Sequence, residues 1–359
     1  MESQASFDIK QLPRIPQECS DAYRAQKELL LYQLNSYLSK DESIIEMTRS
    51  VPHTLVYDLH RYHVALLSSV LELGSYELLL QSLPWEYRAY HNQGLPYEYF
   101  LHIYRFWKLS IEHLFDKECA ESLSAIYDWL RAQHSYVIVL SQNEPDAQNP
   151  SKYEEQYSLL VKNLLEGNQV EVMELCRDSL AENNSLSKLF DTIVQPAMVS
   201  IGLLWERGEI TSAKEHLATA LITKTLSYLY AGQPFINPSR GTAIVTAAPN
   251  EYHELGAWVV STALEKDGWN VHYLGANTPA HDLLSLIKET KADVLAISAV
   301  VPFHLDEIRE LIKRAKLEGV KVMIGGRAFD SMPEVAINMG ADAHLRDAED
   351  AVKKAREWQ

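Results

Sequence analysis

From about residue 240 onward, short apolar runs alternate with amphipathic stretches. The runs GTAIVTAAP, NVHYLGA, DVLAISAV, KVMIGG and AHLRD begin near residues 241, 270, 293, 321 and 343. Stretches between them, such as HELGAWVVSTALEKDG, carry apolar residues at helical spacing. This alternation is typical of a parallel sheet covered on both faces. We therefore expect residues 238–359 to form a doubly wound, flavodoxin-like (Rossmann-type) domain with five parallel strands, which binds ligands beyond the carboxyl ends of its strands.

The preceding segment, residues 151–237, contains helical patterns and no strand-like run. Four helices of this length with short connections predict an antiparallel four-helix bundle. Pro196 lies inside the third helical pattern and should kink or break that helix. The segment GQPFINPSRG, with two prolines and two glycines, should link the bundle to the sheet.

Residues 1–150 are also expected to be all-helical, with a linker near SQNEPDAQNPS. Between Tyr76 and Tyr136, 14 of 61 residues are aromatic, against 9% for the whole chain. Seven of the 13 histidines lie between His53 and His134. Two explanations stay open: a buried aromatic core, or a pocket for a flat chromophore that rings and histidines could hold.

Composition limits the remaining possibilities. The net charge of -16 repels phosphate backbones, so we expect no direct binding of nucleic acid. No apolar run is long enough to span a membrane, and the start MESQASFDIK lacks the features of a signal peptide, so we expect a cytoplasmic protein without membrane contact. Cys19, Cys119 and Cys176 form no CxxC pair and no even set, which predicts reduced, structural thiols.

Three short motifs follow predicted strands. Glu251, His253 and Gly256 form ExHxxG after the first strand, Ser298 and Val300 end the third in SAV, and Gly325-Gly326 ends the fourth. Each motif alone has an ordinary explanation, such as a solvated or capping histidine or a glycine turn. Together they lie on one rim of the predicted sheet, because parallel strands end at the same edge.

This combination resembles the signature of the cobalamin-binding domain family, in which an acidic residue, His and Gly are followed by SxL or SxV and then GG. The resemblance implies that His253 is the lower axial ligand of cobalt and that Glu251 accepts the other ring proton. It also implies that Ser298 hydrogen-bonds the displaced nucleotide tail and that Gly325 and Gly326 leave room for it. Glu251 replaces the commoner Asp, and Val300 the commoner Leu.

A second pattern lies in the predicted bundle, where nine residues separate Trp205 from Glu215-His216. Ser212 and Glu215 could simply form a capping box at a helix start, with Trp205 in the core. The pattern also resembles the helical cap of cobalamin-dependent photoreceptors. That resemblance implies that Trp205 packs on the adenosyl group of adenosylcobalamin and that Glu215 hydrogen-bonds its ribose. His216 would bind cobalt after light removes the adenosyl group.

The helical module in front of this cap is similar to that of the photocobilins, which also hold biliverdin; His91 and His102 are candidate contacts. The resemblance implies a light-dependent homo-oligomer that acts through assembly or a separate output protein, and not an enzyme. One alternative is a corrinoid carrier of a methyltransferase system, which shares the bundle, the lower His and the sheet. A mutase subunit would need a substrate barrel, for which 150 residues are too few unless a partner supplies it.

Overall fold

The computed structural model describes residues 12–143, 153–183 and 185–359 and divides the chain into two compact units. Helices of residues 12–143 form the first unit, with which residues 206–209 and 303–306 are grouped. The remaining described residues form the second unit. The predicted linker is described only at Ser141, Gln142 and Asn143. The rest of it and the predicted boundary at residue 150 lie outside the described residues. Ser141 ends a helix.

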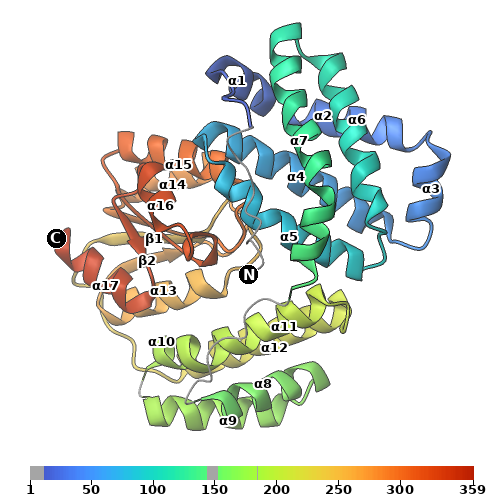
Figure 1. Cartoon of the computed structure of the whole chain (residues 1–359). Coiled ribbons are helices and arrows are strands. Elements are labelled where there is room, and N and C mark those ends of the chain that lie inside the picture. The colour runs from blue at the N-terminus through green and yellow to red at the C-terminus, as the bar shows by residue number, and fades with distance from the viewer. Residues whose placement is uncertain (1–11, 144–152, 184) are drawn as a thin grey trace, which may run out of the picture. The chain divides into compact units, whose positions relative to one another are not determined.

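Helices joined by short connections, without any strand, make up residues 12–143 of the first unit, as predicted (Figure 1). Its helices are α1 (Gln17–Ala25), α2 (Lys27–Leu38), α3 (Glu42–Thr48), α4 (His53–Leu73), α5 (Tyr76–Asn92), α6 (Glu98–Leu114) and α7 (Lys117–Ser141). Gly74 ends α4 at φ 63°, a left-handed conformation that costs glycine little.

Most of the ring-rich segment of this unit forms a buried aromatic core. Tyr87 stacks on Phe100 with ring centroids 3.9 Å apart. The buried His60 contacts Asn35 at 2.9 Å and Tyr99 at 2.6 Å through its two ring nitrogens. Burial lowers the pKa of His60 to about 3, so its ring is neutral at physiological pH. The simpler of the two explanations therefore accounts for these rings.

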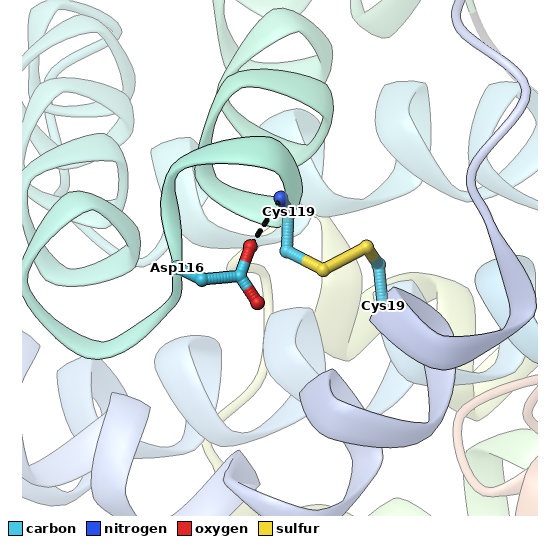
Figure 2. The surroundings of a disulfide bond; sticks show 3 residues. All are labelled: Cys19, Asp116 and Cys119. Carbon is cyan, nitrogen blue, oxygen red and sulfur yellow. Dashed lines mark hydrogen bonds between the residues drawn. A yellow bond between two sulfur atoms is a disulfide. The ribbon is translucent and has the colours of Figure 1, made fainter.

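The prediction of three reduced thiols is wrong for two of them. Cys19 of α1 and Cys119 in the first turn of α7 form a disulfide, with their Cα atoms 5.3 Å apart (Figure 2). Asp116 caps α7 by accepting a hydrogen bond from the Cys119 N–H at 3.0 Å. Cys176 is free and buried. The two bonded cysteines are 100 residues apart in sequence, so only the packing of α1 near the start of α7 reveals the pair.

The second unit begins with the predicted four-helix bundle. It consists of α8 (Glu154–Glu166), α9 (Gln169–Asn183), a third helix made of α10 (Leu186–Leu189), the π-helical turn η2 (Phe190–Val194) and α11 (Gln195–Glu206), and α12 (Ser212–Ala231). The predicted interruption at Pro196 takes the form of the π-helical turn, in which the Gln195 N–H donates to the Phe190 carbonyl. A wider turn relieves the clash of a proline ring with the preceding turn.

The sheet is parallel, with strand order β2-β1-β3-β4-β5, as the predicted flavodoxin-like fold requires. Its strands are β1 (Thr242–Ala247), β2 (Asn270–Tyr273), β3 (Val294–Ser298), β4 (Lys321–Gly325) and β5 (Ala343–Leu345). Its helices are α13 (Leu255–Lys266), α14 (Ala280–Thr290), α15 (Leu305–Leu317), the short η3 (Arg327–Phe329), α16 (Pro333–Asn338) and α17 (Ala348–Glu357). The linker GQPFINPSRG contains neither helix nor strand.

Helices cover both faces of this sheet. In Figure 1, α13 and α17 lie on one face and α14, α15 and α16 on the other. The order reverses between β1 and β3, so the loops after these strands flank the crevice in which such folds bind ligands. The bundle shares a hydrophobic core with α13, to which Val259 contributes. Within the described residues, no helix combines the length and apolar character that a membrane crossing requires.

Candidate functional site

The loop between β1 and α13 presents His253 at the rim of the sheet. The Nδ1 atom of His253 lies 2.5 Å from Oε1 of Glu251, the contact that the resemblance to cobalamin-binding domains implies. Glu251 is only 4% exposed, whereas the His253 side chain is 60% exposed. Because Glu251 occupies Nδ1, the neutral ring keeps its proton there and leaves the lone pair of Nε2 available to a ligand.

Glu251 also ties this loop to the end of β3. Its second carboxylate oxygen, Oε2, accepts hydrogen bonds from the backbone N–H groups of Val300 at 2.9 Å and Val301 at 3.2 Å. Val300 is the last residue of the predicted SxV motif. One buried carboxylate therefore joins the first motif to the second across 49 residues of sequence.

Two carboxylates and one cation influence the pKa of His253. The hydrogen bond to Glu251 raises the pKa of His253, and the carboxylate of Glu215 adds to this effect. Burial and Arg327 oppose it. Burial is the strongest single influence on the pKa of Glu251 and raises it. The hydrogen bond and charge of His253 and the backbone hydrogen bonds from Val300 and His253 together hold that pKa below its ordinary value. Glu215 of the bundle thus acts electrostatically on the histidine of the sheet domain.

Two motif glycines are packed against the SAV motif, and Gly325 is packed against β5. A Cβ at Gly256 would lie 3.2 Å from the Ser298 hydroxyl. A Cβ at Gly325 would lie 2.9 Å from the Leu345 carbonyl oxygen, and one at Gly326 only 2.2 Å from that of Ala299. The close approach of the protein's own backbone therefore requires both glycines of GG. The role of Ser298, Gly325 and Gly326 toward a nucleotide tail stays a prediction.

The bundle residues meet at the start of α12. The Trp205 indole N–H donates to the Ser212 hydroxyl at 3.0 Å, and Glu215 accepts a hydrogen bond from Thr219 at 2.8 Å. His216 is 79% exposed, and its Nε2 lies 3.4 Å from Glu215. The alternative of a capping box is wrong, because α12 begins after Thr211 and no side chain caps it.

These residues suit a metal that arrives inside a macrocycle. Among the described residues, no group of three or more His, Cys, Asp or Glu side chains could hold a metal ion by itself. A corrin ring would bring its cobalt already held by ring nitrogens, so one available imidazole nitrogen of the protein would be enough to bind it. His253 offers that nitrogen, and Glu251 orients it.

Asn277 of the loop after β2 belongs to none of the sequence motifs but contacts the loop that carries His253. Its backbone lies at φ 52°, and it hydrogen-bonds Glu251, Asn250 and Tyr252. The only signal in the sequence is an asparagine in the turn-like run GANTP, which is too common to single out.

Comparison with known proteins shows which family this chain belongs to. Family models described as B12 binding domains match residues 241–356 and residues 158–230. Dimethylamine corrinoid protein 3 of Methanosarcina acetivorans is 33% identical over 165 residues, which are 45% of this chain and 76% of that protein. The chain belongs to the B12-binding corrinoid protein family. Its two B12-binding segments are the bundle and the sheet domain described above, so the cobalamin-binding family predicted from the motifs is confirmed.

A repressor and a solved corrinoid protein structure are also similar to this chain. The HTH-type transcriptional repressor CarH of Myxococcus xanthus is 28% identical over 147 residues, which are 40% of this chain and 48% of that protein. The solved structure of the monomethylamine corrinoid protein of Methanosarcina barkeri covers 58% of this chain and all of that one, at 22% identity and a TM-score of 0.48. The segment of this chain that matches CarH spans about half of the length of CarH.

Proposed function

We propose that this corrinoid protein binds cobalamin at the rim formed by β1, β3 and β4, with Nε2 of His253 as the lower ligand of cobalt. The observation that carries this proposal is the pair of contacts made by Glu251, which holds Nδ1 of His253 and the backbone at Val300 together. A ligand histidine held in this way is oriented before the metal arrives, and its basicity is raised.

The neighbouring motif residues fit the rest of the cofactor. Ser298 and Val300 lie beside the β1–β3 crevice, where an elongated tail could descend along the sheet. Ser298 is partly exposed and offers a hydroxyl, while Gly256 opposite it carries no side chain. We expect Ser298 to hydrogen-bond the tail and the pair Gly325-Gly326 to border it.

We infer further that the bound cobalamin works as a light-dependent switch. Adenosylcobalamin supplies a cobalt–carbon bond that light can break. Trp205 offers a flat surface for the upper group, and Glu215 keeps its Oε2 in reach of polar partners. His216 is an exposed imidazole on the same helix turn and would offer a second nitrogen ligand to the cobalt after the upper group has left.

A second candidate function is supported by the names of the relatives. Seven relatives are dimethylamine corrinoid proteins, which favours a corrinoid carrier of a methyltransferase system more directly than CarH favours a sensor. A carrier has to expose the upper face of its corrinoid to partner enzymes, and Trp205 and His216 would obstruct that access. The helical first unit also lies outside the segments matched by the B12-binding models.

Absorption spectra distinguish these functions. Protein loaded with adenosylcobalamin in the dark should change under green light to the spectrum of cobalamin with two histidine ligands. His216→Ala should abolish that final spectrum, and His253→Ala should weaken binding and remove lower ligation. His281→Ala is the matched control, because His281 is also an exposed histidine beside a carboxylate, that of Asp282 at 3.2 Å. A light-stable spectrum in the wild type would favour the carrier, and unchanged ligation in His253→Ala would refute the proposed lower ligand.

Biliverdin in the first unit is a separate proposal with weaker support. His91 stacks on Tyr97 and lines a surface pocket of about 340 Å³ with Arg88, whereas most other rings are buried against one another. Added biliverdin should produce a red-absorbing band that His91→Ala weakens; no band would remove the bilin from the proposal. We propose that the signal is a change of homo-oligomeric state, or binding of an output protein, in the cytoplasm and without catalysis.

A further inference from the structure

The loop between β2 and α14 holds the histidine loop through one residue. We propose that Asn277 is a positioning residue that sets the segment ahead of His253 in its ligand-binding conformation. This inference rests on the proposed cobalamin site and extends it to a residue outside the three sequence motifs. Asn277 is exposed, so the need to fill a core does not explain its contacts.

Asn277 makes three hydrogen bonds to three consecutive residues. Its backbone N–H donates to the Glu251 carbonyl oxygen at 3.0 Å. Its side-chain Oδ1 accepts from the Asn250 N–H at 3.1 Å, and its Nδ2 donates to the Tyr252 hydroxyl at 3.1 Å. His253 is the next residue along the chain, so every residue from 250 to 252 is fixed immediately before the ligand.

Backbone conformation explains why an asparagine stands at this position. Asn277 lies at φ 52° and Asn250 at φ 60°, in the left-handed region that asparagine tolerates better than most other residues. Two left-handed residues therefore face each other across the pair of loops. Asparagine supplies the conformation together with a donor and an acceptor that glycine lacks.

The hydrogen bond from Asn277 to the Glu251 carbonyl matters because the direction of the Glu251 side chain depends on the conformation of its backbone. Glu251 directs Oε1 to His253 and Oε2 to Val300, and both contacts need the Cα–Cβ direction that the Asn277 bond to the Glu251 carbonyl helps to fix. With the loop released, His253 can leave Glu251 and lose its orientation. Asn277 thus acts on the ligand through Glu251 and touches neither the ring nor the metal.

Asn277→Gly tests this role, because glycine keeps the left-handed backbone and its N–H but removes both side-chain hydrogen bonds. Amide hydrogen exchange of the apoprotein should become at least several-fold faster at residues 250–253. Cobalamin affinity should fall about tenfold, as expected when two exposed hydrogen bonds leave a binding loop. The fraction of cobalamin ligated by histidine, measured by visible absorption, should fall as well.

Asn270→Ala is the matched control, because Asn270 is an exposed asparagine of β2 that bonds Thr242 at the opposite end of the sheet. It should leave exchange at residues 250–253 and histidine ligation unchanged. If Asn277→Gly does not fold, Tyr252→Phe removes the Nδ2 contact from the other side and should increase exchange at the same amides.

The two proposals fail in different ways. The positioning role would be overturned if residues 250–253 of Asn277→Gly exchanged their amide hydrogens as slowly as in the wild type, even if the protein binds cobalamin. The same holds for Tyr252→Phe where that variant replaces Asn277→Gly. A wild-type protein that binds no corrinoid would refute the proposed function, while faster exchange in the apoprotein would still establish that Asn277 orders the loop.

Discussion

At the scale of single residues, Glu251 is the centre of the site. Its two oxygens accept five hydrogen bonds, from Tyr252 N–H, His253 N–H and His253 Nδ1 on one side and from Val300 N–H and Val301 N–H on the other. A buried carboxylate is stable only when it is satisfied in this way. The five contacts explain how an acidic residue can be 4% exposed at the rim of a sheet.

Gly326 offers a test of the backbone packing at this rim. Gly326→Ala combines φ 104° with a Cβ 2.2 Å from the Ala299 carbonyl oxygen. It should lower the free energy of unfolding by about 2–4 kcal/mol, from left-handed strain and overpacking together. Gly319→Ala is the control, since Gly319 lies at φ 83° with no atom within 4 Å of its Cβ, and it should cost only about 1 kcal/mol. Equal losses in urea unfolding would contradict the packing argument.

At the scale of elements, the bundle meets the sheet domain through an unfavourable set of charges. Asp191 of the π-helical turn η2 is partly buried, and burial together with Asp347 and Glu349 raises its pKa to about 6. Asp347 caps α17, and Glu349 lies in its first turn, where the helix dipole favours negative charge. The charge that suits α17 therefore disfavours ionisation of Asp191.

Asp191→Asn should stabilise the protein in a pH-dependent way. Between pH 4 and 6 the folded state holds a proton on Asp191 that the unfolded state has released. Asp191 therefore does not lower the free energy of unfolding below about pH 4, lowers it increasingly between pH 4 and 6, and lowers it fully above that range. The gain from the substitution should be larger at pH 8 than at pH 5 by about 1 kcal/mol, after a discount for solvent screening. Urea unfolding at the two pH values measures it. Asp178→Asn, at an exposed position of α9, should show no such difference, and an equal gain at both pH values would refute the assignment.

At the scale of the whole molecule, the two units have different sources of stability. The second unit is built from the bundle and the sheet domain, which share a hydrophobic core at Val259. The first unit has its own aromatic core and the disulfide between Cys19 and Cys119, which closes a loop of 100 residues. A cross-link over so long a loop restricts the unfolded chain strongly.

Cys19→Ala should lower the stability of the first unit by about 2–4 kcal/mol in oxidised protein. The same substitution should have little effect in protein that was reduced beforehand, which is the control. Thiol titration of the unfolded wild type should detect one thiol, that of Cys176, before reduction and three after it. Three thiols without reduction would show that the bond does not form.

Local patterns in the sequence determined the fold of the sheet domain and several contacts within single loops or helices. Five apolar runs with helices between them predicted the doubly wound sheet, because local periodicity reports which faces of an element are buried. The family resemblance carried by ExHxxG implied the hydrogen bond between Glu251 and His253, and the two residues can meet because they lie in one short loop. Pro196 predicted a disturbed helix because its missing N–H acts locally.

Only the tertiary structure decided the contacts between segments far apart in sequence. The bond between Cys19 and Cys119, the link from Glu251 to Val300 and the hold of Asn277 on the histidine loop all join different elements. Sequence spacing carries no measure of such distances, because strand order and helix packing set them. The motifs and their family resemblance thus named the candidate residues, and packing determined which of them meet.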